Sequence, residues 1–367
     1  MNRDKPYLNE ETWEYFWHPV CTLTELRSAS DRGPIKQIKL LGRKLVIAEL
    51  DCGVVAMDDR CAHRSASLAL GSVESNCIRC PYHGWLYDNN GKCVEIPAMP
   101  DLMIPKKAKV NRYEVEVRYD LVWVKLKPGL ELEIPVLRSW DDPKMKCVQG
   151  NAYEWPTSGP RRMENFFDLA HFAFIHDGSL GTREDPLVPI PEIDQLLGQL
   201  RWKYYPENRY GATSDASKDS LRIPMDYADY VAQLPFHISL VNKLKDGSQV
   251  EIWMCASPIK SDQVRCFWFS CRSEDHDGDD SKYIDIQESV VLKEDLPVVA
   301  SQDPKELPHP SLEISVPTDK IHVNYRRRLF ELSNAYTNGG VKTLAEKLTE
   351  VEIETDENYE ELLQEAP

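Results

Sequence analysis

Two short phrases that each pair a cysteine with a histidine constrain this chain more than any other feature. Cys61-Ala-His63 and Cys80-Pro-Tyr-His83 are separated by sixteen residues. Together they supply two thiolates and two imidazoles, which is a ligand set that metal centres use. Gly84, directly after the second phrase, allows a tight turn. We therefore expect a fold that brings two loop tips together around a metal.

Two kinds of metal centre fit this ligand set. In a 2Fe–2S cluster of the Rieske type, two cysteines hold one iron and two histidines hold the other. The alternative is structural zinc, because Cys77-Ile-Arg-Cys80 is also a C-x-x-C pair that could bind zinc with His63 or His83. Each phrase has its own cysteine-then-histidine form, which favours the cluster and leaves Cys77 as a packing residue. A chain with this cluster transfers single electrons.

A second group of metal-binding residue types lies about a hundred residues downstream, within a predicted helical segment 160–178. Asp168 and His171 are three residues apart, so they are neighbours on one helical face. His176 is five residues beyond His171, so a helix end or bend must bring both rings to one metal. Two histidines and one carboxylate on one octahedral face are typical of non-haem Fe(II) oxygenases. The alternative is an amphipathic helix whose histidines only pack.

The third ligand of such an iron should be a carboxylate from elsewhere in the chain, but 60 of the 367 residues are acidic. Segment 287–302 is predicted to be helical, and one of its faces carries Asp295, Val298, Val299 and Gln302. A carboxylate on an apolar stripe is costly to bury unless it is paired or bound to metal. Asp295 is the predicted ligand and Glu294 the competing candidate. The alternative is an acidic residue that only favours a helix N-terminus.

The two constellations resemble those of the Rieske non-haem iron oxygenases. The first resembles the N-terminal domain of that family, and 165–176 resembles its N-x-x-D-x-x-H-x-x-x-x-H signature. Respiratory-chain Rieske proteins have an extra disulfide cysteine in each loop, where this chain has Ala66 and Tyr82. Over residues 13–335 the chain is similar to bacterial N-demethylases of methylxanthines, O-demethylases of methoxyaromatics and some alkaloid-tailoring hydroxylases.

The resemblance implies roles for individual residues. Asp295 matches the aspartate of the family's E-D segment, which is the third ligand of the mononuclear iron. Asp168 matches the aspartate that links the iron-site histidine, here His171, to the Rieske histidine His83 of the partner subunit. Electrons would then cross a subunit interface, which implies a ring of subunits, usually a homotrimer.

The resemblance also implies a reaction. We expect a monooxygenase that uses a 2Fe–2S cluster, Fe(II) and O2 to hydroxylate a C–H bond of a small molecule. No glycine-rich dinucleotide motif is found, so a separate NAD(P)H-dependent reductase, with or without a ferredoxin, should supply the electrons. N- or O-demethylation is favoured slightly over ring or aliphatic hydroxylation. A Rieske electron-transfer protein and a zinc-stabilised binding protein are the non-enzyme alternatives.

The substrate pocket is the least constrained part of the sequence. Its candidate residues are Asn165, Phe166, Tyr230, His237, Trp253 and Phe267. Aromatic side chains on strands could stack on a flat substrate, although strand aromatics also build cores. His237 could bind substrate or could be a satisfied core histidine.

Composition bounds the class of protein. The net charge of −16 argues against nucleic-acid binding, and no apolar stretch could span a bilayer. The N-terminus has no signal-peptide pattern, so the ten cysteines are expected to be reduced thiols and cluster ligands in a cytoplasmic protein.

An α+β fold with two domains is expected. Short strands separated by turns, including Asn90-Gly91, predict an antiparallel β domain over 13–130 that carries the cluster on two loops. A catalytic domain of helix-grip type should follow over 145–340. Its antiparallel sheet is predicted from strands at 229–241, 248–258 and 263–272, with iron-bearing helices beside it. Residues 341–367 are expected to form an acidic helical tail.

Overall fold

The computed structural model describes residues 7–178, 180–196, 198–205, 225–274 and 276–349. These residues fall into two compact units. One comprises Trp13–Ile134 with Ser257–Lys260, and the other comprises the described parts of 1–12, 135–256 and 261–367. Of the predicted tail 341–367, only 341–349 lie within the described residues, where they form the helical stretch that follows a break at Gly340 (φ +69°) within α5 (Lys320–Thr349). None of the described helices is both long and apolar enough to cross a membrane.

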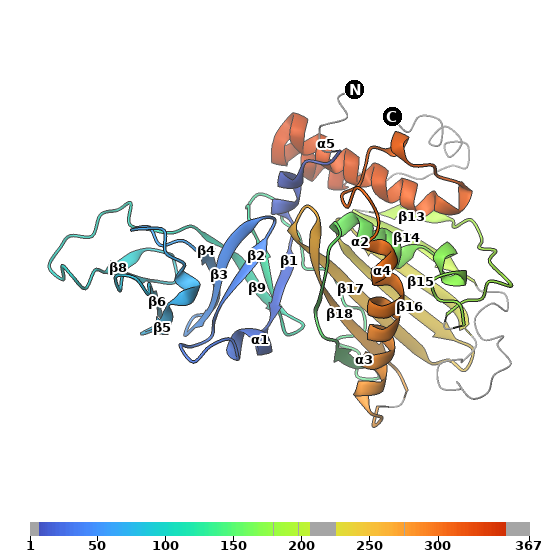
Figure 1. The fold of residues 1–367 in the computed structure, drawn as a ribbon, viewed down its shortest axis with the longest axis horizontal. Coiled ribbons are helices and arrows are strands. Elements are labelled where there is room, and N and C mark those ends of the chain that lie inside the picture. The colour runs from blue at the N-terminus through green and yellow to red at the C-terminus, as the bar shows by residue number, and fades with distance from the viewer. Residues whose placement is uncertain (1–6, 179, 197, 206–224, 275, 350–367) are drawn as a thin grey trace. The chain divides into compact units, whose positions relative to one another are not determined.

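The N-terminal unit is built from two antiparallel sheets, as its short strands predict (Figure 1). The larger sheet has the order β1-β10-β9-β4-β3-β2, with strands β1 (His18–Thr22), β10 (Leu121–Lys125), β9 (Arg112–Arg118), β4 (Gly53–Asp58), β3 (Arg43–Leu50) and β2 (Ile35–Leu40). The smaller sheet has the order β5-β6-β7-β8, with β5 (Ser72–Glu74), β6 (Cys77–Arg79), β7 (Leu86–Tyr87) and β8 (Cys93–Glu95). The other elements of this unit are the short helices η1 (Glu10–Tyr15), which begins just before it, α1 (Leu23–Arg27) and η2 (Leu68–Leu70).

The predicted Asn-Gly hairpin joins β7 to β8. Gly91 has a φ of +75°, and a Cβ atom there would lie 2.4 Å from the carbonyl oxygen of Val110. Glycine is required on both grounds, because other residues rarely adopt positive φ and none could avoid the contact. The turn is held by Asp88 Oδ1, which accepts hydrogen bonds from the backbone N–H groups of Asn90 and Lys92.

The C-terminal unit contains an eight-stranded antiparallel sheet of order β11-β18-β17-β16-β15-β14-β13, with β12 also paired to β18. The strands are β11 (Lys146–Gln149), β12 (Tyr153–Trp155), β13 (Ile193–Leu196), β14 (Gln199–Tyr204), β15 (Met225–Gln233), β16 (His237–Leu244), β17 (Gln249–Lys260) and β18 (Gln263–Arg272). The predicted strand 229–241 is therefore wrong as one element. A turn containing Pro235 divides it, and Tyr325 Oη donates a hydrogen bond to the Pro235 carbonyl.

Helices cover one face of this sheet (Figure 1). They are α2 (Gly159–Phe167), η3 (Ala170–Ala173), α3 (Asp280–Glu288), the π-helical turn η5 (Ser289–Asp295) and α4 (Leu296–Val299). The short helices η6 (Pro310–Leu312) and η7 (Pro317–Asp319) lead into α5.

Two predicted helices differ from the observed ones. Segment 160–178 is not one helix, because α2 ends at Asp168, whose extended backbone (φ −72°, ψ 133°) breaks it. The second helical stretch begins at Asp280 rather than 287 and ends at Val299. Only part of its predicted apolar face is buried, since Asp295 and Val299 are buried whereas Val298 and Gln302 are exposed.

One disulfide corrects the expectation that all cysteines outside the cluster are reduced. Cys147 on β11 and Cys271 on β18 lie directly opposite each other, with their Cα atoms 4.0 Å apart, and are bonded. Their separation of 124 residues hid this pairing from the sequence.

Candidate metal centres

The first two ligand phrases lie on two loops of the N-terminal unit that make matching turns. One loop follows β4 and the other joins β6 to β7. Cys61 N–H donates to the carbonyl of Ala66 at 2.8 Å, and Cys80 N–H donates to that of Trp85, also at 2.8 Å. Gly84 has a φ of +73°, as the expected tight turn requires. Each loop therefore presents its cysteine and histidine from a rigid turn.

The two histidine rings of these loops lie edge to face. The ring centroids of His63 and His83 are 4.6 Å apart, and His63 stacks on Trp85 at 4.5 Å. Nδ1 of His63 is buried and has no hydrogen-bond partner among the described residues. Desolvation and the nearby His83 and Arg64 lower the pKa of His63, which favours the neutral ring that a metal ligand needs. His83 is exposed.

Both cysteine thiols are buried, and that of Cys61 contacts a tyrosine hydroxyl. Cys61 and Cys80 are 3% and 2% exposed, and Tyr87 Oη lies 3.1 Å from Cys61 Sγ. Burial raises the pKa of the Cys80 thiol, and the neighbouring Cys61 raises it further. Cys77 lies on β6 opposite Glu74, away from the loop tip. Two thiols, two imidazoles and one unpartnered buried ring nitrogen fit a 2Fe–2S cluster of the Rieske type.

In the C-terminal unit, His171, His176 and Asp295 converge on one point. His171 lies on η3, which follows the break at Asp168, and this bend brings the ring of His176 back toward it. The two Nε2 atoms are 3.2 Å apart. Asp295 Oδ1 lies 3.1 Å from Nε2 of His176 and 3.5 Å from Nε2 of His171. One ligand atom from each residue lies within 4.8 Å of the others, so the three could hold one metal ion.

Two further carboxylates contact the Nδ1 atoms of these histidine rings, opposite the Nε2 atoms that converge. Nδ1 of His171 lies 3.3 Å from Asp168 Oδ2, and Nδ1 of His176 lies 2.6 Å from Glu294 Oε2. Metal-binding histidines generally donate their second ring N–H to such a group, which fixes the tautomer and the orientation of the ring. Asp295 therefore faces the Nε2 atoms on which a metal could be held, whereas Glu294 contacts the opposite nitrogen of His176.

The charged groups of this site stabilise one another's ionised forms. Burial opposes ionisation of Asp295, but the hydrogen bond from His176 and the positive charge of Arg162 outweigh it and lower the pKa of Asp295. Burial also opposes protonation of His176, but Asp295 and Glu294 outweigh it and raise the pKa of His176. A buried cluster with this excess of negative charge attracts a cation.

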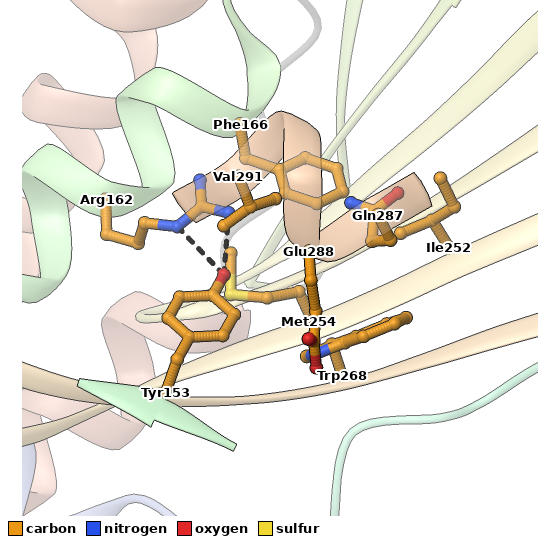
Figure 2. Close-up of a pocket in the computed structure, with 9 residues that line it drawn as sticks. All are labelled: Tyr153, Arg162, Phe166, Ile252, Met254, Trp268, Gln287, Glu288 and Val291. Carbon is orange, nitrogen blue, oxygen red and sulfur yellow. Dashed lines mark hydrogen bonds between the residues drawn. The ribbon is translucent and has the colours of Figure 1, made fainter. Parts of the chain in front are cut away.

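A pocket lies between the helices and the sheet beside this cluster (Figure 2). Its lining residues are Tyr153, Arg162, Phe166, Ile252, Met254, Trp268, Gln287, Glu288 and Val291. Val291 is one helical turn before Asp295, and Phe166 is adjacent to Asn165, whose Nδ2 donates to Asp295 Oδ1 at 3.1 Å. The pocket is therefore next to the candidate iron ligands.

The predicted pocket residues divide between the two faces of the sheet. Asn165 and Phe166 lie on α2 at the pocket side. Tyr230 stacks on Trp202, which in turn contacts Phe167 of α2, so Tyr230 lies on the face of the sheet that α2 covers.

The other three predicted pocket residues require a correction. Trp253 lies between the pocket-lining Ile252 and Met254, and Phe267 precedes Trp268, so strand alternation directs both to the opposite face. His237 packs on Trp253, with ring centroids 4.8 Å apart. These aromatic residues belong to the core on that face.

Sequence reasoning missed Arg162, Tyr153 and Gln287. Arg162 and Tyr153 lie outside the ligand signature, and only the pairing of β12 with β18 brings Tyr153 to the pocket. The one signal in the sequence was the spacing of Arg162, which is three residues before Asn165 and therefore shares its helical face. The structure shows that this arginine is buried.

Comparisons with known proteins agree with both centres. Residues 16–114 match the Rieske [2Fe-2S] domain family, and residues 156–335 match the vanillate O-demethylase oxygenase C-terminal domain family. Methylxanthine N1-demethylase NdmA of Pseudomonas putida is 39% identical over 364 residues, which cover 98% of each chain. Methylxanthine N3-demethylase NdmB of the same organism is 40% identical over 345 residues, covering 91% of this chain and 94% of the relative.

A solved structure is similar over the same range. The structure of Pseudomonas putida CBB5 NdmA with caffeine superimposes with a TM-score of 0.87 and 38% identity, covering 95% of this chain and 99% of that one. The predicted α+β fold, oxygenase class, 2Fe–2S cluster, Fe(II) and O2 are thereby confirmed, and the electron-transfer and zinc-binding alternatives are excluded. Enzymes of this kind act on small molecules with electrons from a reductase. This chain belongs to the Rieske non-haem iron oxygenases, in the group that includes the methylxanthine N-demethylases.

Proposed function

We propose that this chain is the terminal oxygenase of a system that removes a methyl group from a ring nitrogen of a methylxanthine or a closely related flat heterocycle. The observation that carries the proposal is the convergence of His171, His176 and Asp295 beside an apolar pocket. The likeness of nearly the whole chain to two methylxanthine N-demethylases supports it.

The reaction balances with one O2 and two electrons. A C–H bond of the N-methyl group is hydroxylated by one oxygen atom, and the other oxygen leaves as water after taking up two electrons and two protons. The mononuclear iron, when bound, supplies O2 activation, and the cluster supplies the electrons one at a time. The hydroxymethyl product then breaks its C–N bond, which releases formaldehyde and leaves an N–H group on the ring.

Seven residues are proposed as metal ligands. The cluster ligands are Cys61, His63, Cys80 and His83, and the mononuclear iron ligands are His171, His176 and Asp295. Cys61 and Cys80 are buried, so they would hold the cluster from the interior of the unit, whereas the exposed His83 would hold it at the surface, where an electron could enter or leave.

Asp168 is proposed to bridge the two centres between subunits of a homotrimer. Its Oδ2 lies 3.3 Å from His171 Nδ1, and its Oδ1 accepts a hydrogen bond from Ala170 N–H at 2.8 Å. The side chain is still 25% exposed, so a second donor could reach it from outside. The exposed ring of His83 of the partner subunit would be that donor.

The side chains that line the pocket include groups that could recognise a flat heterocycle that bears carbonyl groups. Phe166 and Trp268 supply aromatic walls (Figure 2), and Val291, which is four residues before Asp295 in the chain, also lines the pocket. The Gln287 amide offers both a donor and an acceptor in these apolar surroundings. A small number of such polar groups sets the orientation of a ligand in an apolar site. We propose that Gln287 orients the ring and so decides which N-methyl group faces the iron.

Product analysis tests this proposal. The iron-loaded protein is assayed with a reductase, NADH and methylxanthines that differ in which nitrogen carries a methyl group, while formaldehyde, O2 uptake and the purine product are measured. We expect one formaldehyde per demethylated purine. The control is His171→Ala, which should keep the absorbance of the cluster but lose turnover. A hydroxylated product that retains its methyl group would refute demethylation, and the absence of any O2-dependent product would refute the proposed substrate class.

A further inference from the structure

We propose that Arg162 is a positioning residue that holds Asp295 through Asn165 and connects this iron ligand to the wall of the substrate pocket. The coupling to the pocket rests on the proposed function, whereas the positioning of Asp295 does not. Arg162 contacts neither of the two histidine ligands in any hydrogen bond found among the described residues.

A continuous chain of hydrogen bonds carries this proposal. The Arg162 guanidinium donates from Nη2 to Tyr153 Oη at 2.9 Å and from Nη1 to Asn165 Oδ1 at 2.8 Å. Asn165 then donates from Nδ2 to Asp295 Oδ1 at 3.1 Å. This carboxylate oxygen is also the one that faces the Nε2 atoms of both histidines.

The guanidinium helps to fix which way the Asn165 amide points. An asparagine amide has one acceptor end and one donor end. Arg162 can only donate, so it takes the oxygen end and leaves the nitrogen end for Asp295. Asp295 itself favours the nitrogen end, so Arg162 adds the second anchor, at the oxygen end. Without Arg162 the amide would be held at one end only and could swing away from the carboxylate, which would weaken this hydrogen bond. The carboxylate would then be free to rotate about its own side-chain bonds.

Burial makes this arrangement stiff. Arg162 is 2% exposed, and its guanidinium lies 4.6 Å from the ring centroid of Trp155. Its two hydrogen-bond acceptors, the Asn165 amide and the Tyr153 hydroxyl, are neutral groups. A buried cation of this kind requires a compensating negative charge. Asp295, at the end of the hydrogen-bond chain from Arg162, is an acidic group that can supply part of it.

The same residues form part of the pocket wall. Tyr153 and Arg162 line the pocket and are joined by hydrogen bonds there (Figure 2). Phe166, which also lines it, is adjacent to Asn165 in α2. A ligand in the pocket therefore contacts groups that hold Asp295, and through them pocket occupancy is coupled to the geometry of this carboxylate.

Near-infrared magnetic circular dichroism of the Fe(II)-loaded protein, with the cluster kept oxidised, reads out this geometry without turnover. We compare Arg162→Met, Asn165→Ala and the wild type, each with and without a methylxanthine. Both variants should shift the ligand-field bands of the substrate-free protein. The change caused by substrate should fall to less than half of the wild-type change. Arg162→Lys, which can still donate to Asn165, should restore part of it.

Arg161→Met is the matched control, because it removes a neighbouring buried guanidinium that pairs with Glu313 at 2.7 Å and not with Asn165. Its spectra should match the wild type. If Arg162→Met does not fold, Asn165→Ala at its half-buried position decides the matter alone. Wild-type bands and a full substrate response in the variants would overturn the proposal. If no methylxanthine is turned over by the wild type, the proposed substrate fails, while the substrate-free comparison still decides the positioning role.

Discussion

Replacement of Glu294 tests how the iron site is built. Its Oε2 lies 2.6 Å from Nδ1 of His176, and the ring is 1% exposed. Glu294→Gln keeps an acceptor at this place but removes its charge, whereas Glu294→Ala removes both. If Asp295 is the metal ligand and Glu294 only supports His176, both variants should weaken Fe(II) binding without abolishing it.

The expected size follows from the kind of hydrogen bond that is changed. A hydrogen bond to a charged group contributes about 1 to 1.5 kcal/mol more than a neutral one. Glu294→Gln should therefore raise the Kd for Fe(II) roughly tenfold, since about 1.4 kcal/mol corresponds to a factor of ten. Glu294→Ala should approach the roughly hundredfold loss that is typical when the partner of a metal-bound histidine is removed.

Competition of the protein with a coloured Fe(II) chelator measures both constants, and the visible absorbance of the cluster shows that the N-terminal unit is intact. Asp285→Asn, an exposed acid on α3, is the control and should leave the Kd unchanged. An unchanged Kd in Glu294→Ala would refute the supporting role. A loss beyond a thousandfold in Glu294→Gln, together with a mild effect of Asp295→Asn, would mean that the two residues exchange roles.

Three further predictions concern stability and selectivity. Burial lowers the pKa of His18 to about 4, whereas its value in the unfolded chain is about 6.5, so this group should cost on the order of 3 kcal/mol of stability as the pH drops from 6.5 to 4. Because burial also lowers the pKa of His237, urea unfolding of the wild type and of His18→Gln should both depend on pH, and the wild type should lose about 3 kcal/mol more; an equal loss in both proteins would contradict this. Gly91→Ala should destabilise the N-terminal unit by more than about 1 kcal/mol, because of its positive φ and the contact with Val110; an unchanged thermal midpoint for loss of cluster absorbance would contradict this. Gln287→Leu should raise KM roughly tenfold for the preferred methylxanthine, because a hydrogen bond to the substrate is lost, and should change the ratio of demethylated products. An unchanged product ratio would show that Gln287 does not orient the substrate ring.

Local chemistry made the ligand phrases predictable from the sequence. Cys61, His63, Cys80 and His83 stand at spacings that a loop tip imposes, and the hairpin at Gly91 depends on one turn. The break between α2 and His171 was also foreseeable, since a five-residue spacing cannot place two rings on one face of a regular helix. In such cases the geometry depends on residues that are close in sequence.

The pocket depends instead on which face of a strand is covered. Alternation indicates that Trp253 and Ile252 point to opposite sides, but it does not say which side carries the helices. Trp253 and Phe267 are predicted as pocket residues because they are aromatic, yet the smaller Ile252 and Met254 line the pocket. The pairing of Cys147 with Cys271 was hidden for the same reason, because strand register over 124 residues is a tertiary property.

The π-helical turn Ser289–Asp295 explains how two adjacent carboxylates can serve one histidine. Neighbouring residues are separated by about 100° around an α-helix but by only about 80° in a π-helix, which has a wider turn. Glu294 and Asp295 can therefore both face His176, one at Nδ1 and the other at Nε2. The ring is held between consecutive residues of one turn, and the same turn places Val291 in the pocket wall. A π-helical turn is rare and, where it interrupts an α-helix, is frequently found at a functional site. Here the seven residues of one such turn carry the proposed metal ligand, the proposed supporting carboxylate and part of the pocket wall.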